Sequence, residues 1–483
     1  MMKRFLVAVS LSAAAASMAA VSPQPMKLGY VYDITREKVP TGETLRRVAD
    51  IVSSLGYGQM QLYFKDNFAY PDHKEVWQGR AHVTPEEIRD FDRYCAAKGL
   101  ELVPYQSAFG HLEPWMKFER YRKLAENEGK YFCTALNREM NGAALCPTAP
   151  ESLDFLNGLF DVLLPCFSSR YANLGCDEVW DLHSASGKSA EEIRRKGIGR
   201  VYLEFLLKMH ALLKARGKTM MFWSDIIRNY PHLVNELPED VIALDWSYEG
   251  SAPYNLTTAA LKHAPCRYYV CPGTSSWCSF FGRHHNMRAN VQNAWHWARR
   301  NGAEGLLLTD WGDNGHPQPW IVSLPSLVFT SMLVKNGKAP SDAEIAAKVD
   351  EICSCRIGAS LICAANAYLR ATDPHMENGT MLYRISMQTK SFRMPGHLVE
   401  GDFASALAKL RESAAMRDLS GAPQWVRDDV ELLDLLVDFT ARRINGDKSS
   451  LVGHYRERYT RLWNTQNRPG GVEESMRKVF AGE

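Results

Sequence analysis

Two consecutive carboxylates, Asp177 and Glu178, directly follow the apolar segment 171–176. Cleavage of a glycosidic bond needs a carboxylic acid that protonates the leaving oxygen and a second group that stabilises the oxocarbenium-like carbon, and this pair could supply both. Side chains of consecutive residues in an extended segment point in different directions, however. The pair is then poorly arranged to flank one bond as acid and independent nucleophile, and we expect one of the two to act through the substrate.

Charged and aromatic side chains also follow the other apolar segments. A pyranose offers hydroxyl groups that bind charged side chains and an apolar C–H face that packs on aromatic rings, so a sugar site needs both residue types in one pocket. Besides the carboxylate pair, the candidate site residues are Arg36, Asp66, His111, Asp225, Trp246, Tyr248, Trp277, Trp311, Asp313 and His316. This combination is typical of a sugar-binding pocket.

Between residues 24 and 336, short apolar runs alternate with longer amphipathic stretches. The alternation predicts βα units around a parallel sheet, and eight units over about 300 residues match the size of a (β/α)8 TIM barrel. The active site of that fold lies at the carboxyl ends of the strands, where the candidate residues would meet. The predicted strands are 28–33, 59–64, 100–105, 171–176, 219–224, 241–246, 267–271 and 305–310.

Helix signals separate the predicted strands and then dominate the end of the chain. Thr84 to Glu87 combines an N-cap, a proline in the first turn and a capping-box glutamate, which predicts a helix that ends near Gly99. One long amphipathic helix is predicted over 190–215. We expect a helical C-terminal region over 337–483, with helices at 341–353, 359–371, 404–415, 428–443 and 455–463.

The first twenty residues differ from the rest. A basic start, an apolar run over 5–16 and small residues up to Ala19 and Ala20 predict a signal peptide over 1–20, cleaved near Ala19 or Ala20, and export to the periplasm or the exterior. No segment reaches the roughly 20 apolar residues that a membrane-spanning helix needs.

The overall composition narrows the class of partner. The formal net charge is +2, with no long Lys/Arg run, which argues against a nucleic-acid partner. The eleven cysteines lack the paired spacing of a zinc site, so we expect no metal. An exported protein could form disulfides, although the odd count leaves at least one thiol unpaired within the chain. Asn378-Gly379-Thr380 is a glycosylation sequon, and the oligomeric state is left open.

The segment Leu174 to Trp180 contains Gly-Cys-Asp-Glu-Val and resembles the Gly-x-Asp-Glu signature of the β-N-acetylhexosaminidases, glycoside hydrolase family 20. It is most similar to the hexosaminidase D branch of that family. Further matches follow in the same order as in the family, over about residues 26 to 330, at 32–36, 106–113, 146–148, 222–225 and 309–311. The chain departs from the pattern at Asn173, where family members commonly have histidine.

The resemblance implies substrate-assisted catalysis without a cofactor, on a glycan with a terminal N-acetylhexosamine. Asp177 would orient the 2-acetamido group, whose carbonyl oxygen attacks the anomeric carbon, and Glu178 would act as general acid and then as the base for water. Tyr248 would hydrogen-bond the acetamido oxygen. The resemblance further implies aromatic walls from Trp246, Trp277 and Trp311, and hydroxyl contacts from Arg36, Asp66, Asp313 and His316.

Several of these residues have simpler alternative roles. His111 could be a core histidine bound by backbone groups, Arg36 could lie on the surface, and the tryptophans could be ordinary packing. A second Asp-Glu pair, at 350–351, lies in an amphipathic helical pattern and is interpreted as a solvated face. Two other functions also remain open: a barrel glycosidase of different sugar specificity and a catalytically silent glycan-binding protein. The sequence does not rank GlcNAc against GalNAc.

Overall fold

The computed structural model describes residues 26–36, 38–368, 377–387 and 400–481. The predicted signal peptide, residues 1–20, lies outside the described residues. In the part of the chain that is described, no helix has the length and apolarity that a membrane crossing requires. All eleven cysteines are free thiols with buried side chains.

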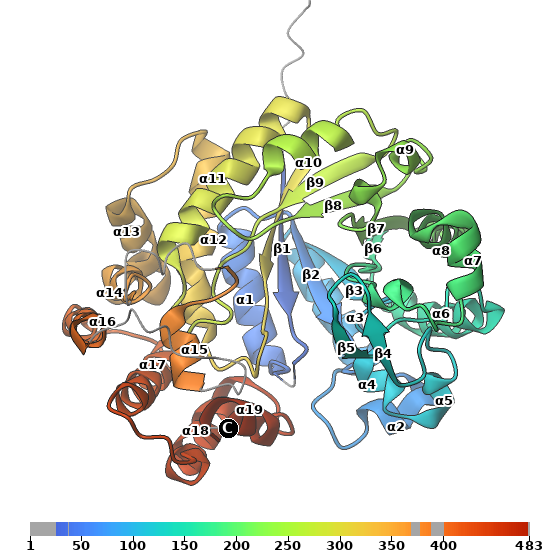
Figure 1. The fold of residues 1–483 in the computed structure, drawn as a ribbon. Coiled ribbons are helices and arrows are strands. Elements are labelled where there is room, and N and C mark those ends of the chain that lie inside the picture. Colours follow the sequence, from blue (N-terminus) through green and yellow to red (C-terminus); the bar gives the residue numbers. More distant parts are fainter. Residues whose placement is uncertain (1–25, 37, 369–376, 388–399, 482–483) are drawn as a thin grey trace, which may run out of the picture.

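Eight parallel strands close into a barrel in the order β1-β10-β9-β8-β7-β6-β3-β2 (Figure 1). Nearly every strand residue is buried, because helices cover the outside and side chains fill the inside, and this explains the continuous apolar runs. All eight predicted strands are present and the (β/α)8 fold class is confirmed, but the strand predicted over 171–176 ends at Asn173. The barrel strands are β1 (Lys27–Asp33), β2 (Gln59–Phe64), β3 (Glu101–Gln106), β6 (Tyr171–Asn173), β7 (Thr219–Trp223), β8 (Ile242–Trp246), β9 (Arg267–Cys271) and β10 (Gly305–Asp310).

Helices on the outside connect the strands. The predicted capping box is present on α3, where the Thr84 hydroxyl accepts from the Glu87 amide and the Glu87 carboxylate accepts from the Thr84 amide. The prediction of one helix over 190–215 is wrong, because Gly197 has a φ of 82° and separates two helices at that point. The larger helices around the barrel are α1 (Gly42–Ser54), α3 (Pro85–Ala97), α6 (Pro150–Leu163), α7 (Ala190–Lys196), α8 (Ile198–Ala215), α10 (Tyr254–Leu261), α11 (His284–Asn301) and α12 (Leu324–Asn336).

The connection between β3 and β6 carries an antiparallel hairpin that the sequence analysis did not predict. Its strands β4 (Lys130–Cys133) and β5 (Arg138–Asn141) have four residues each and are largely exposed, so they lack the apolar runs of the barrel strands. Cys133 forms an isolated antiparallel β-bridge with Ser184, which lies in the loop that follows the catalytic candidates. The remaining short helices of the barrel are α2 (Lys74–Trp77), α4 (Glu113–Met116), α5 (Glu119–Arg122) and α9 (Pro231–Val234).

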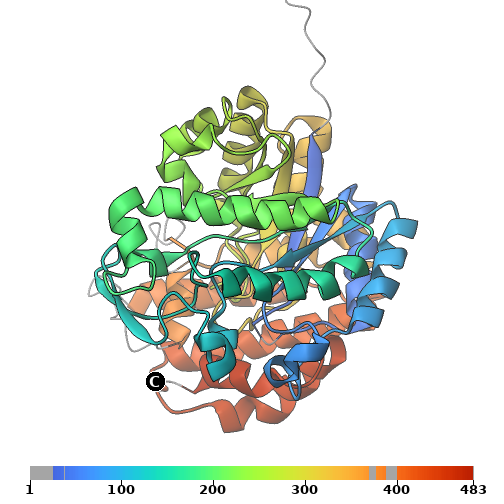
Figure 2. The same ribbon diagram turned by 90° about the vertical axis from the view of Figure 1, so that its right-hand side faces the viewer.

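The C-terminal region is helical, as predicted, and gathers at one end of the barrel, drawn orange to red at the bottom of Figure 2. The Arg468 amide donates to the Val39 carbonyl at 2.8 Å, and the Ile321 amide donates to the Asp429 carboxylate at 3.1 Å. The helix predicted over 359–371 ends at Ala364, and residues 369–371 lie outside the described residues. The helices are α13 (Asp342–Cys353), α14 (Gly358–Ala364), α15 (Met381–Met387), α16 (Glu400–Ala415), α17 (Gln424–Ile444), α18 (Val452–Gln466) and α19 (Val472–Phe480).

Candidate active site

A cavity of about 340 Å³ opens at the carboxyl ends of the barrel strands. Nine of the twelve residues predicted from the sequence line it, and the remaining three lie elsewhere. The predicted lining residues are Arg36, His111, Asp177, Glu178, Trp246, Tyr248, Trp277, Trp311 and Asp313. The lining residues that the sequence analysis missed are Tyr63, Tyr105, Ser247, Glu249, Glu377 and Asn378.

The backbone after β6 turns sharply, and this turn directs both catalytic candidates into the cavity. Gly175, Cys176 and Glu178 have φ values of 69°, 74° and 48°, so the segment is not extended. An oxygen of Asp177 and an oxygen of Glu178 therefore lie within 4.8 Å of each other. The expectation that consecutive carboxylates diverge is wrong here, because it assumed an extended backbone. Left-handed conformations of residues with side chains are strained, and they concentrate at functional sites.

His111 connects the two carboxylates. Its Nε2 atom lies 3.1 Å from Asp177 and 3.6 Å from Glu178, and its Nδ1 atom lies 3.8 Å from Glu113. Burial would lower the pKa of His111, but the Asp177 charge and the hydrogen bonds with Asp177 and Glu113 raise it to about 10. The imidazole is then protonated at neutral pH and donates to Asp177, which fixes the orientation of that carboxylate.

The same three side chains could in principle hold a divalent cation, since His111, Asp177 and Glu178 offer ligand atoms within 4.8 Å of one another. A histidine binds metal only through an unprotonated ring nitrogen, however. A cation at this position would therefore have to displace the proton that His111 shares with its carboxylate neighbours.

Glu178 has the properties of a general acid. Burial raises the pKa of its carboxyl group, the positive charge of His111 opposes this rise, and the negative charges of Asp177 and Asp313 add to it. The Glu178 amide donates to the Asp225 carboxylate at 3.0 Å, and this hydrogen bond stabilises the turn that follows β6. Burial and the Asp177 charge raise the pKa of Asp225 to about 7. Asp225 thus supports the backbone of Glu178 and does not line the main cavity.

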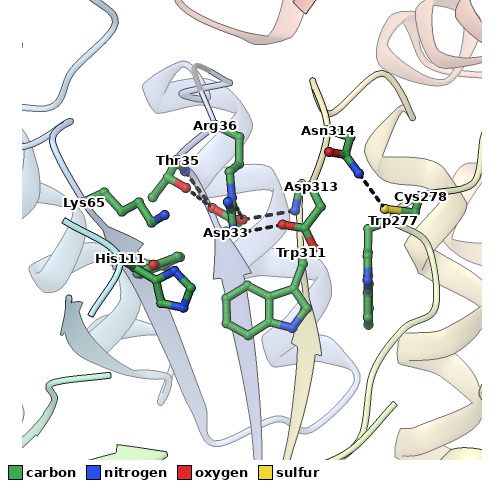
Figure 3. Close-up of polar contacts among 12 residues, drawn as sticks. Asp33, Thr35, Arg36, Lys65, His111, Trp277, Cys278, Trp311, Asp313 and Asn314 are labelled. Carbon is green, nitrogen blue, oxygen red and sulfur yellow. Dashed lines mark hydrogen bonds and ion pairs between the residues drawn. The ribbon is translucent and has the colours of Figure 1, made fainter. Parts of the chain in front are cut away.

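Arg36 is held at the cavity edge between two carboxylates, as Figure 3 shows. Its guanidinium lies 3.3 Å from Asp33 and 2.9 Å from Asp313. Asp33 also accepts from the Thr35 amide at 2.9 Å and from the Gly312 amide at 3.0 Å. A guanidinium group whose position is fixed in this way can donate hydrogen bonds to the hydroxyl groups of a sugar. Asp33 was not among the predicted site residues, although its position as the last residue of β1 was an available signal.

Aromatic rings form the walls of the cavity. Trp246 and Tyr248 stack with centroids 5.0 Å apart, and Trp277 meets Tyr248 edge-on at 5.1 Å. Trp311 packs edge-on against Tyr63 at 5.6 Å. Burial raises the pKa of Tyr248, so its hydroxyl remains protonated and can donate a hydrogen bond. The result is an apolar surface on which the Tyr248 hydroxyl can act as a donor, and this combination suits an acetamido group.

The C-terminal region completes one side of the cavity. Asn378 lies 101 residues from Trp277 and accepts a hydrogen bond of 3.0 Å from its indole nitrogen. The Asn378 amide donates to Glu249 at 2.9 Å, and Glu249 forms a two-pronged ion pair with Arg283. Asn378 and its neighbour Glu377 line the cavity. No local sequence signal marks this long-range contact.

Asp66 and His316 also lie outside the main cavity. Asp66 pairs with Arg80 at 2.6 Å. The ring of His316 packs over Gly312, which has no side chain to obstruct it, and so turns toward a separate cavity of about 30 Å³ beneath the C-terminal helices. Burial lowers the pKa of His316, which leaves the ring neutral. The geometry does not support the hydroxyl contacts expected for Asp66 and His316.

Asn173, which stands where family members commonly have histidine, has a structural role. Its side-chain oxygen accepts from the Gly175 amide at 3.0 Å, and its side-chain nitrogen donates to Gln61 at 2.9 Å. Asn173 therefore stabilises the start of the turn that carries Asp177 and Glu178.

Comparisons with known proteins agree with this geometry. A model of the glycosyl hydrolase family 20 catalytic domain matches residues 63–303. Human hexosaminidase D is 22% identical over 353 residues, which cover 68% of this chain and 69% of that protein. A β-hexosaminidase of Akkermansia muciniphila is 23% identical over 218 residues, which cover 40% of this chain and 43% of that protein.

A solved structure shares the fold. A chitobiase of Flavobacterium johnsoniae has a TM-score of 0.53 at 14% identity, over 94% of this chain and 78% of that one. The matched residues include β6 and the Asp177–Glu178 pair that follows it. This chain belongs to glycosyl hydrolase family 20.

Proposed function

We propose that this protein is an exo-acting β-N-acetylhexosaminidase, which releases terminal β-linked GlcNAc or GalNAc from glycans with retention of configuration. The observation that carries the proposal is the convergence of Asp177 and Glu178 on one cavity with aromatic walls. The relatives are named for the same activity, as hexosaminidase D and β-hexosaminidase.

The spacing of the carboxylates supports the retaining outcome. Inverting glycosidases hold their two carboxyl groups about 6.5–9.5 Å apart to make room for a water molecule. Oxygens of Asp177 and Glu178 lie within 4.8 Å of each other, which is too close for that arrangement.

The environment of each carboxylate suggests its role. Glu178, whose pKa is raised chiefly by burial, protonates the leaving oxygen and then activates water. Asp177 is held by protonated His111 and remains a hydrogen-bond acceptor for the N–H of the 2-acetamido group. The acetamido oxygen then attacks the anomeric carbon, the glycosidic bond breaks and an oxazolinium ion forms, which water opens. Tyr248, Trp246, Trp277 and Trp311 enclose the acetamido group.

A retaining glycosidase in which Asp177 itself attacks the sugar is the second candidate. The separation of the two carboxylates favours it, because a direct nucleophile and its partner acid stand about 5–5.5 Å apart. The hydrogen bond from His111 opposes it, since a carboxylate that accepts from an imidazolium is a weaker nucleophile.

A paired assay tests the proposal. The purified protein is given aryl β-N-acetylglucosaminide, aryl β-N-acetylgalactosaminide and aryl β-glucoside, with and without a thiazoline mimic of the oxazolinium ion. We expect turnover of at least one N-acetyl substrate, little turnover of the glucoside, and competitive inhibition by the thiazoline. Absence of turnover with both N-acetyl sugars would reject the activity. Turnover that the thiazoline does not inhibit would support direct attack by Asp177.

We also propose that residues 1–20 direct export of the protein. The charge and apolar pattern of that segment is the support for this step. Fractionation of the producing cells, with N-terminal sequencing of the mature chain, tests it.

A further inference from the structure

A broad cavity of about 960 Å³, here called the distal cavity, lies at the amino-terminal ends of the barrel strands. Lys27 starts β1 and Arg267 starts β9, and both line it together with the last turns of α11 and α12. This end of the barrel is drawn at the top of Figure 2, away from the C-terminal helices. The six residues of β10 separate it from the active site by roughly 20 Å, so one sugar ring cannot occupy both cavities.

The lining of the distal cavity carries an excess of positive charge. Its charged residues are Lys27, Arg267, Arg299, Lys335 and Glu304. Glu304 pairs with Lys27 and lies 3.4 Å from Arg267, which leaves Arg299 and Lys335 without a carboxylate partner among the described residues. The ends of α11 and α12 each add about half a negative charge, so an excess of about two positive charges remains. A cavity with this charge attracts an anionic ligand.

Trp295 of α11 provides an aromatic surface in the distal cavity. The guanidinium carbon of Arg299 lies 5.0 Å from the centroid of its ring. Stacking of this kind fixes a guanidinium group while its N–H donors remain available in the plane. Arg299 also reaches the end of α12, because a Cβ on Gly337 would lie 3.9 Å from its Nη1 atom. Lys335 belongs to the last turn of that helix, so the two cations without a carboxylate partner lie near the same helix end.

Trp295 also lines an adjoining cavity of about 330 Å³ between α11 and α12. The polar side chains of this adjoining cavity are Gln292, Asn293 and His296. Neutral polar groups around an indole ring suit the hydroxyl groups and the C–H face of a pyranose. Because a cationic cavity lies next to this surface, the two cavities together suit an acidic saccharide of more than one ring.

We propose that the distal and adjoining cavities form a second glycan-binding site, which takes saccharides that carry sulfate or carboxylate groups. A pyranose ring packs on Trp295, and Arg299 and Lys335 bind the anionic groups. The site is separate from the catalytic pair, so binding there does not depend on the proposed activity.

Calorimetric titration of the purified protein with three hexasaccharides tests this inference, with excess thiazoline present to occupy the active site. The ligands are a heparin hexasaccharide with sulfate and carboxylate groups, a hyaluronan hexasaccharide with carboxylate groups alone, and neutral chitohexaose. We expect an acidic hexasaccharide to bind at least about tenfold more tightly than chitohexaose, because charged hydrogen bonds form only with the acidic ligand. Added salt should weaken that binding. Binding of heparin alone would identify sulfate as the required group, and binding of both acidic ligands would show that carboxylates suffice; either result supports the inference.

The same helix offers a matched pair of control residues. Trp297 and Arg300 also stack, at 5.5 Å, but they line neither cavity. Trp295→Ala and Arg299→Gln should each weaken binding of the acidic hexasaccharide about five- to tenfold, whereas Trp297→Ala and Arg300→Gln should stay within about twofold of wild type. Near-ultraviolet circular dichroism checks that each variant is folded. Arg299 is exposed, so Arg299→Gln decides the test even if Trp295→Ala misfolds.

Three results would overturn the inference. One is the absence of measurable binding of both acidic hexasaccharides to the wild-type protein. Another is an equal loss of binding in the variants of the two tryptophan–arginine pairs, which would place the ligand elsewhere. The third is equal affinity for chitohexaose or for a hexaglutamate peptide, which would show that the site does not select acidic saccharides.

Discussion

The Asn378 side-chain oxygen accepts a hydrogen bond of 3.0 Å from the indole nitrogen of Trp277, across 101 residues of sequence. Trp277 belongs to the loop after β9, whereas Asn378 precedes α15 in the C-terminal region. The contact means that the C-terminal region forms part of the cavity wall. A glycan on the sequon at Asn378 would disrupt it, because the same side chain would carry the sugar.

Replacement of Asn378 by alanine tests this contact. The buried Trp277 indole loses its acceptor, so the wall loosens and KM for an N-acetylhexosaminide should rise about fivefold, the equivalent of about 1 kcal/mol. The value of kcat should change little, because the hydrogen bonds of Asn378 go to Trp277 and Glu249. Michaelis–Menten kinetics on an aryl substrate measure both constants. Asn336→Ala, at the exposed end of α12, is the control, and an unchanged KM in Asn378→Ala would show that the contact does not shape the site.

Glu178→Gln should reveal the general acid through the leaving group. Loss of proton transfer costs about 10²- to 10⁴-fold in rate where the leaving alcohol needs protonation. An aryl leaving group needs little protonation, so the formation of the intermediate from an aryl substrate should fall much less. Comparison of the aryl and methyl glycosides of the same sugar measures this difference. Glu351→Gln changes the exposed member of the second Asp-Glu pair, whose Asp350 is half-buried and accepts from the Ile357 and Gly358 amides, so the pair is not the solvated face expected from the sequence. Glu351→Gln should match wild type, whereas equal losses on both glycosides would argue against an acid role for Glu178.

The pH profile should respond in opposite directions to two neighbours of Glu178. The acid is active when protonated, so the alkaline limb of kcat/KM follows its pKa in the free enzyme. Asp313 raises that pKa and His111 lowers it. Asp313→Asn should move the alkaline limb to lower pH, and His111→Asn should move it to higher pH, even though both variants lose activity. If the alkaline limb moved in the same direction in both variants, that result would contradict the assignment of Glu178 as the titrating acid.

The parts of the site that the sequence predicted correctly are those that follow directly from strand positions. Trp246, Trp311 and Arg36 come at or just after strand ends, and barrel geometry alone brings such positions together. The direction of a side chain after a strand depends on the loop conformation, however. Asp66 and His316 also come after strands, β2 and β10, but they face Arg80 and Gly312.

The sequence analysis failed where distant segments or unusual backbone conformations decide the structure. The left-handed φ of Glu178 brings two neighbouring carboxylates together, and no residue pattern announces it. Glu377 and Asn378 reach the cavity only because the C-terminal helices dock on the barrel. Pattern analysis therefore identified the chemistry of the site but not its full boundary.

The docking of the C-terminal helices should make the barrel and the helical region unfold together. Asp429 of α17 accepts from the Ile321 amide at 3.1 Å and from the Gln466 side chain, and it is 3% exposed. Asp429→Ala leaves the Ile321 amide without this acceptor, which should lower the free energy of unfolding by about 1–3 kcal/mol.

Denaturant unfolding measures the free energy of unfolding of the variant. The transition is followed both by near-ultraviolet circular dichroism and by loss of activity, and the two transitions should coincide. Glu412→Ala, the control, changes a glutamate of α16 that is 55% exposed and pairs with the exposed side chain of Lys409. Since surface ion pairs contribute little, it should cost under about 1 kcal/mol. Separate transitions for the two probes in Asp429→Ala would contradict joint unfolding of the barrel and the helical region.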